Sequence, residues 1–221
     1  PLPLSIAPPP ETPKIFIMPE VASNPSRAFQ YLVGRGINPE IVQWCIDHRL
    51  IFETAKHGNV LFIGYDQDGN PTYGAVRSTT DSFKGDVKGS DKRFSVKIVN
   101  AQSPRTVHVF EAAIDLLSYA TLEKQFGEKW LKRSYLSLAG IGSGKSIPKA
   151  LEHFLKDYPE ISYINLHLDN DEPGRIAAKN IKETLGSRYK FRDNPPPFGQ
   201  DFNDFLLHKN EKAKQPKTIR R

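Results

Sequence analysis

Four acidic side chains stand where two predicted strands end. Glu111 directly follows the short apolar stretch 106–110, and Asp115 lies four residues later, one helical turn away, so both can face the same point. Asp169 and Asp171 end another apolar stretch, and residues two apart in extended chain point the same way. If the two strands are neighbours, they deliver three or four carboxylates to one cleft.

Carboxylates that lie so near one another raise one another's pKa unless a cation lies among them. Hard oxygen ligands favour Mg²⁺ or Mn²⁺, ions that stabilise the attacking and leaving oxygens in phosphoryl transfer. Each motif also has an ordinary interpretation: a Glu at a helix start favours the helix dipole, and Asp-Asn-Asp before Pro-Gly is typical of a turn. The placement of both at the ends of successive strands favours the metal site.

The elements that must position these residues alternate between strands and helices. The pattern predicts strands over 106–110, 135–138 and 161–168 and helices over 112–126, 148–155 and 173–185. Such alternation implies a parallel sheet, whose chemistry gathers at the carboxyl ends of the strands. The first half instead predicts helices over 26–34 and from Pro39, then a hairpin of strands 59–65 and 72–77 around an Asp-Gly turn.

Two segments resemble the TOPRIM domain, the metal-binding fold of bacterial-type primases, topoisomerases and some nucleases: residues 110–118 (FEAAIDLLS) and 168–178 (LDNDEPGRIAA). The family pattern is one Glu after the first strand and Asp-x-Asp after the third, which Glu111, Asp169 and Asp171 match. The resemblance implies that these three residues are catalytic.

Other motifs are more similar to primases than to other TOPRIM proteins. Asp115 matches the acidic residue that primases carry one helical turn after the Glu. Asp201 matches the first Asp of the last acidic motif of primases, Asp-Pro-Asp, and Asn203 stands in place of its second Asp. Residues 31–41 and 62–77 resemble the opening of the primase core. In detail the first half, including residues 88–92, is most similar to the uncharacterised domain that precedes TOPRIM in proteins of plasmids and other mobile elements.

The implied fold class is α/β, with a Rossmann-like, parallel-sheet TOPRIM subdomain preceded by a small α+β subdomain. We expect four parts: a Pro-rich linker (1–19), an N-terminal primase-like subdomain (20–104), the TOPRIM domain (105–208) and a basic tail (209–221).

The resemblance implies metal-dependent nucleotidyl transfer that makes RNA primers on single-stranded DNA, for plasmid or mobile-element replication. Expected partners are the template, nucleoside triphosphates and a replicative helicase. Mg²⁺ or Mn²⁺ would be bound by Glu111, Asp115, Asp169, Asp171 and Asp201. The template would be bound by Arg77, Lys84, Lys88, Lys92 and Arg93. Two alternatives stay open: a metal-dependent nuclease, which would cut DNA without nucleotides, and a catalytically silent DNA-binding module.

A competing motif lies at residues 139–146 (AGIGSGKS), which nearly fits the phosphate loop G-x-x-x-x-G-K-S/T with Ala139 in place of the first glycine. Too few residues follow it to complete a nucleotide-binding ATPase sheet. In a TOPRIM domain it is the turn after the second strand, and we expect from Lys145 a supporting phosphate contact. His108 and His167, in predicted strands, we interpret as partly buried structural residues.

The composition limits the class of protein. A net charge of +6 suits a nucleic-acid partner, although residues 205–221 carry most of that excess. No apolar run approaches the ~18 residues of a membrane-spanning helix. One cysteine, Cys45, excludes an internal disulfide and favours a reducing, cytoplasmic location. Because the chain starts at Pro1 and its single methionine is Met18, we expect it to be part of a longer protein.

Overall fold

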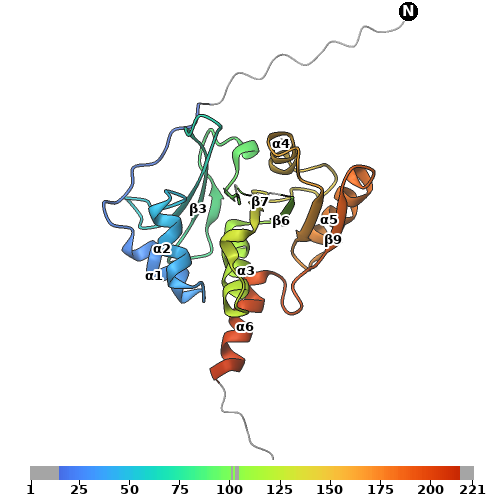
Figure 1. The fold of residues 1–221 in the computed structure, drawn as a ribbon. Coiled ribbons are helices and arrows are strands. Elements are labelled where there is room, and N and C mark those ends of the chain that lie inside the picture. Colours follow the sequence, from blue (N-terminus) through green and yellow to red (C-terminus); the bar gives the residue numbers. More distant parts are fainter. Residues whose placement is uncertain (1–14, 101, 103–104, 215–221) are drawn as a thin grey trace, which may run out of the picture.

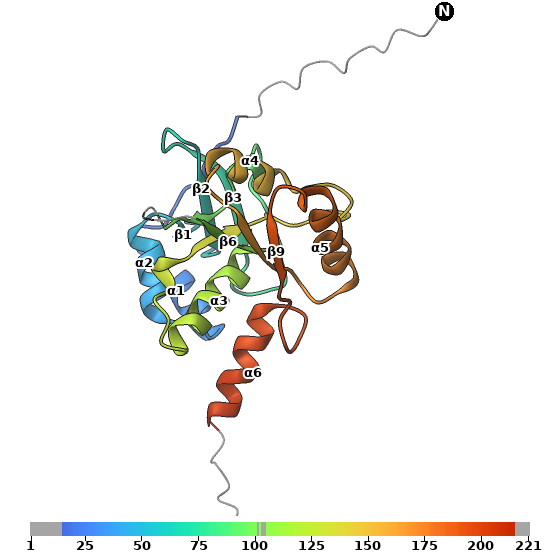
Figure 2. The ribbon, with the colours of Figure 1, turned by 45° about the vertical axis from the view of Figure 1, so that its right-hand side comes forward.

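The computed structural model describes residues 15–100, 102 and 105–214 and contains two β-sheets (Figures 1 and 2). Most of the expected Pro-rich linker and the last seven residues of the expected basic tail lie outside the described residues. Residues 209–214 belong to the last helix. The helices are α1 (Ser26–Gly34), α2 (Pro39–Asp47), α3 (Ala113–Gln125), α4 (Lys149–Asp157), α5 (Glu172–Leu185) and α6 (Phe202–Lys214).

The first sheet is antiparallel, in the order β1-β2-β3-β4. The predicted hairpin is confirmed: the turn between β2 and β3 is held by Asp66 Oδ1, which accepts from the backbone N–H of Asp68 (3.0 Å) and of Asn70 (2.8 Å). Helices α1 and α2 pack on this sheet. Its strands are β1 (Ile51–Glu53), β2 (Val60–Tyr65), β3 (Pro71–Arg77) and β4 (Lys84–Asp86).

The second sheet has the order β5-β7-β6-β8-β9 and is parallel except for β5. The three predicted strands and three predicted helices of this half are confirmed, and the α/β class with them. The sequence did not predict the two edge strands, β5 and β9. The strands are β5 (Lys97–Ile98), β6 (Thr106–Phe110), β7 (Ser134–Ser137), β8 (Tyr163–His167) and β9 (Lys190–Asp193).

Helix α3 lies between the two sheets and joins them (Figure 1). Nine of its thirteen residues are buried, which explains its weakly amphipathic sequence, because an interior helix contacts apolar neighbours on most sides. The same core contains Trp44, whose ring meets Trp130 edge-on at 5.3 Å, and Cys45, whose thiol pKa burial raises to about 12. One continuous core thus fixes the N-terminal sheet against the parallel sheet.

His108 on β6 and His167 on β8 are buried beneath α3 and α6. Nδ1 of His108 lies 2.9 Å from Nε2 of His167. Burial lowers the pKa of His108 to about 4 and that of His167 to about 3, so both rings are neutral at physiological pH. They are structural, as expected, and more deeply buried than predicted. No helix in the described ranges is long and apolar enough to cross a membrane.

Candidate active site

The sheet register brings the predicted acidic residues to one edge. In the parallel pair β6–β8, Phe110 stands opposite His167, so Glu111 and Asp169 leave the sheet side by side. Asp115 lies on the first turn of α3, and Asp201 directly precedes α6. Three segments that are distant in sequence, which carry Glu111 with Asp115, Asp169, and Asp201, therefore bring carboxylates to the same cavity.

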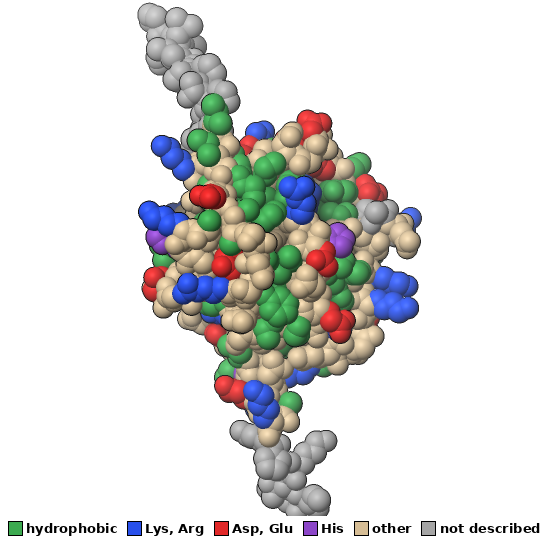
Figure 3. Space-filling view, turned by 90° about the vertical axis from the view of Figure 1, so that its left-hand side faces the viewer, with side chains coloured by type: hydrophobic (Ala, Val, Ile, Leu, Met, Phe, Trp, Pro, Cys, Tyr) green, Lys and Arg blue, Asp and Glu red, His purple; other side chains and the backbone are tan. Residues whose placement is uncertain are grey.

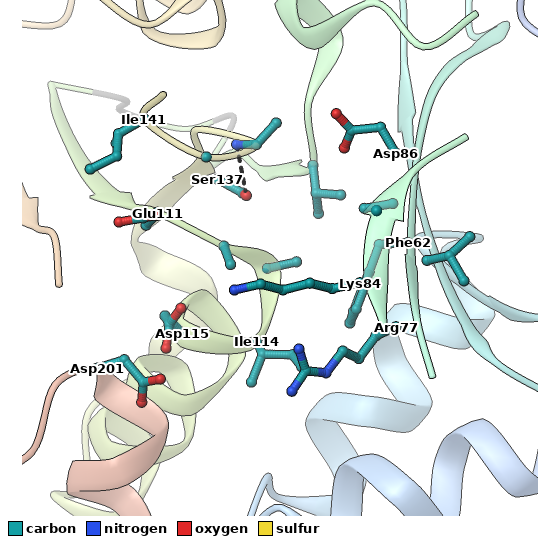
Figure 4. Close-up of a pocket in the computed structure, with 18 of the residues that line it drawn as sticks. Phe62, Arg77, Lys84, Asp86, Glu111, Ile114, Asp115, Ser137, Ile141 and Asp201 are labelled. Carbon is teal, nitrogen blue, oxygen red and sulfur yellow. Dashed lines mark hydrogen bonds between the residues drawn. The ribbon is translucent and has the colours of Figure 1, made fainter. Parts of the chain in front are cut away.

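These carboxylates line a cavity of about 430 Å³ between the two sheets. Glu111, Asp115, Asp169 and Asp201 come from the half with the parallel sheet, and Asp86 is a fifth carboxylate, on β4 of the N-terminal sheet. Three cationic residues of the N-terminal half also line the cavity: Arg35, Arg77 and Lys84. Figure 4 shows Lys84 and Arg77 extending from the N-terminal sheet toward Asp115 and Asp201. Asp171 does not line the cavity, because it caps α5 by accepting a hydrogen bond from Gly174 N at 2.8 Å.

Burial and mutual repulsion raise the pKa of three of the carboxylates. Asp115 is 5% exposed, and its pKa is raised well above the ordinary value by burial and then by Asp201 and Asp169. Burial and the charges of Glu111, Asp201 and Asp171 raise the pKa of Asp169 to about 7. The pKa of Glu111 is raised in the same way, by burial first. Such shifts are typical of functional sites.

The loop that carries Asp169 is fixed by a residue whose role the sequence did not reveal. Arg175 donates to the carbonyl oxygens of Leu168 (2.8 Å) and Asp169 (3.1 and 3.2 Å) and forms an ion pair with Asp193 at 2.9 Å. Gly174 is required here, because a Cβ at this position would lie 2.1 Å from the Asp169 carbonyl oxygen. The Pro-Gly-Arg sequence thus sets the backbone under the acidic motif.

Asn203, the departure from the primase pattern, is fully buried and does not line the cavity. Its Oδ1 accepts from Arg35 Nε at 2.7 Å, and its Nδ2 donates to the Arg35 carbonyl (2.8 Å) and to Ser118 Oγ (3.0 Å). It therefore joins the end of α1 to α3 and α6 and orients Arg35 at the cavity. The substitution leaves the four carboxylates of the parallel-sheet half in place.

Two of the five predicted template contacts point into the cavity. Arg77 and Lys84 are directly opposite each other in the antiparallel pair β3–β4, and Arg77 Nε donates to Tyr31 Oη at 3.2 Å. Two like charges directly opposite each other on neighbouring strands are destabilising unless an anion compensates them. Their position suits a negatively charged ligand.

The other predicted basic contacts lie elsewhere. Lys92 pairs with Asp86 at 3.0 Å and donates to the Ala139 carbonyl at 2.7 Å, while Arg93 pairs with Asp91. Lys88 and Lys145 are exposed and do not line the cavity. Figure 3 shows basic and acidic side chains interspersed over the outer face of the N-terminal half, without a continuous basic patch.

The donor set fits a hard divalent cation. Among the described residues, no three His, Cys, Asp or Glu side chains lie close enough to hold one metal ion as they stand. Yet every donor is a carboxylate oxygen, and Oδ1 of Asp115 and Oδ1 of Asp169 are buried without a hydrogen-bond partner. Buried carboxylate oxygens normally have a partner, so these two are suited to a cation.

Comparison with known proteins agrees with this geometry. Residues 108–206 match the family model described as Toprim-like. These residues therefore form a Toprim-like domain. Residues 30–101 match a family described as a protein of unknown function, DUF3991. An uncharacterized protein of Bacillus anthracis, pXO2-78, is 31% identical over 180 residues, 76% of this chain and 49% of the relative. The chain therefore spans about half the length of that relative.

Solved primases share the fold of this chain. The primase fragment of the bacteriophage T7 primase-helicase protein superposes with a TM-score of 0.58 at 21% identity, covering 81% of this chain and 69% of that one. The DnaG primase catalytic domain bound to single-stranded DNA gives a TM-score of 0.54 at 16% identity, covering 85% and 69%. At such identities the similarity concerns the fold.

Proposed function

We propose that this chain is a primase-like catalytic core that joins nucleotides into RNA primers on single-stranded DNA with Mg²⁺ or Mn²⁺. Its two functional parts would be the N-terminal subdomain, residues 20–104, and the TOPRIM domain, residues 105–208. The observation that carries the proposal is the cavity between them, lined by four carboxylates of the second part and by three cationic side chains and Asp86 of the first.

The carboxylates would hold the metal. Glu111, Asp115, Asp169 and Asp201 are the candidate ligands, with Asp171 next to them at the start of α5. When bound, a divalent cation would neutralise developing charge on the transferred phosphoryl group. The raised pKa of Glu111 and of Asp169 reflects buried carboxylates that repel one another, and a bound cation would relieve that repulsion.

The cationic side would bind phosphate groups. Arg35 is held by Asn203, and Arg77 by Tyr31, so two guanidinium groups are oriented before a ligand arrives. Lys84 adds a third charge on an exposed strand. We propose that these residues bind the template or the nucleotide, and that Lys88 contributes from outside the cavity.

The partners proposed here follow from the similar proteins. One of these primases is described as bound to single-stranded DNA, and the other is part of a primase-helicase protein. We therefore propose a DNA template, nucleoside triphosphates and a replicative helicase as partners. We also propose a role in plasmid or mobile-element replication, because the first half resembles the domain that precedes TOPRIM in proteins of such elements.

The decisive experiment incubates the chain with single-stranded DNA, Mg²⁺ or Mn²⁺ and labelled nucleotides. We expect extension products from the wild-type chain and none from Glu111→Gln, while Lys145→Ala retains most activity. Cleavage without nucleotides would instead identify a nuclease, and retardation of DNA without either product would identify a binding module. ATP hydrolysis that needs Lys145 and not Glu111 would contradict the assignment.

A further inference from the structure

In the loop after β7, the backbone angle φ alternates in sign from one residue to the next. Of residues 140–144, the glycines have positive φ, and the intervening Ile141 and Ser143 do not. Such alternation turns successive backbone N–H groups toward one side and forms an anion-binding concavity. The preceding Ala139 also has a positive φ, of 57°, which is strained for a residue with a Cβ. The three glycine angles are 83° at Gly140, 58° at Gly142 and 70° at Gly144.

Two residues of this loop line the cavity and have N–H groups without a partner among the described residues. Gly140 N donates to the Glu111 carbonyl at 3.0 Å, and Gly144 N donates to Ile141 O at 3.0 Å. The N–H groups of Ile141 and Gly142 donate to no acceptor among the described residues, and both residues line the cavity. Ile141 is only 8% exposed, and buried backbone N–H groups normally have a partner.

Contacts at several points fix the conformation of this loop before any ligand binds. Lys92 Nζ holds the Ala139 carbonyl at 2.7 Å, and the Ile141 side chain belongs to the core of the parallel sheet. Gly144 packs so tightly on α5 that a Cβ would lie 3.1 Å from Pro173 O. Figure 4 shows Ile141 on the same side of the cavity as Glu111, across from Asp86, with Lys84 also on that opposite side.

This loop differs from an ATPase phosphate loop, in which the Gly-Lys-Ser sequence opens the following helix. Here α4 begins only at Lys149, after Pro148, and Lys145 is exposed outside the cavity. Any ligand contact must therefore come from the backbone of residues 140–142. This backbone lines a cavity whose opposite wall carries cationic side chains together with Asp86, so an anion accompanied by a divalent cation is the fitting ligand.

We infer that the free N–H groups of Ile141 and Gly142 bind phosphate oxygens of the polyphosphate chain of a nucleoside triphosphate. The inference rests on the proposed function, because it places the nucleotide in the same cavity as the carboxylates. Hydrogen bonds from N–H groups to a charged acceptor are stronger than those between neutral groups. This loop would distinguish a polyphosphate from a single backbone phosphate.

A pair of glycine variants tests the loop. Gly142 and Gly127 both have positive φ (58° and 82°), and a Cβ at either would meet no atom within 4 Å. Gly142→Ala and Gly127→Ala therefore impose a similar backbone strain and a similar fall in Tm, but only the first disturbs the free N–H groups. Gly127 follows α3 and does not line the cavity, which makes it the matched control.

The measurement is calorimetric binding of Mg²⁺–tripolyphosphate and, separately, of an oligothymidylate. We expect Gly142→Ala to weaken tripolyphosphate binding about tenfold or more, with Gly127→Ala unchanged and the oligonucleotide little affected. Equal affinities for the two variants, or a loss confined to the oligonucleotide, would overturn the inference. No turnover is involved, so a chain that shows the expected pattern but makes no primer would contradict the proposed function and still support this site.

Discussion

The carboxyl group of Asp169 should make the metal-free protein less stable at neutral than at mildly acid pH. Its pKa is about 7 in the folded chain against an ordinary 3.8, because of burial and then of the neighbouring charges of Glu111, Asp201 and Asp171. The folded chain thus binds this proton more tightly than the unfolded chain. The resulting stabilisation is complete below about pH 4 and is lost as the pH rises to about 7.

The size of the effect follows from the shift. A difference of about three pKa units corresponds to at most about 4 kcal/mol, at 1.36 kcal/mol per unit. Because the group is partly exposed, screening by water reduces this to about 1–2 kcal/mol. Asp169→Asn removes the charge and should raise Tm at pH 8 by about 2–8 °C in a chain of this size, with a smaller rise at pH 5, where only part of the stabilisation is lost.

The assay is thermal unfolding in EDTA from pH 5 to pH 8, with Asp68→Asn as control. Asp68 is an exposed aspartate in the turn between β2 and β3, so its variant should follow the wild type at every pH. Adding Mg²⁺ at 100 times its Kd should stabilise the wild type by about 2.7 kcal/mol and Asp169→Asn much less. An Asp169→Asn chain that is no more stable than the wild type at pH 8 would refute the electrostatic argument.

Four further variants test the surroundings of the cavity. Asn203→Ala breaks three hydrogen bonds to buried or oriented partners and should lower the free energy of unfolding in urea by about 2–4 kcal/mol. Arg77→Ala with Lys84→Ala should reduce the salt slope of single-stranded DNA binding by about 1.4, two contacts at ~0.7 each, in fluorescence anisotropy, while Lys88→Ala changes it less. Arg175→Ala should weaken Mn²⁺ binding about tenfold or more in calorimetry, because it releases the backbone under the acidic motif, and unchanged affinity would contradict that role.

The predicted elements were those with a clear apolar period. Strands β6 and β8 are mostly buried and carry apolar residues at alternate positions, and α5 carries a regular apolar stripe, so their residue types determine them. Strand β4, whose sequence is Lys-Gly-Asp, is exposed along its length and has no such signal. Edge strands of this kind depend on the neighbouring strand for their hydrogen bonds, and short local sequence does not predict them.

The acidic side of the cavity was predictable for the same reason. The spacing of Glu111 and Asp115 and the end of β8 are local features, and the parallel register brings them together. The cationic side depends on contacts between distant segments. Nothing local distinguishes Lys84, which faces the cavity, from Lys92, which is bound to Asp86 and the Ala139 carbonyl. Arg35 reaches the cavity only through Asn203, 168 residues away.

The two sides of the cavity stabilise each other across the junction of the sheets. Burial raises the pKa of Glu111 and of Asp169, and Lys84 on the opposite sheet opposes that rise. Conversely, the carboxylates offset the repulsion between Lys84 and Arg77, which are paired in register on β3 and β4. In the absence of the other sheet, the like charges on each sheet would repel one another without compensation. The core around α3 that joins the sheets is therefore part of the site, because it sets the separation between the residues that would bind a metal and those that would bind phosphate.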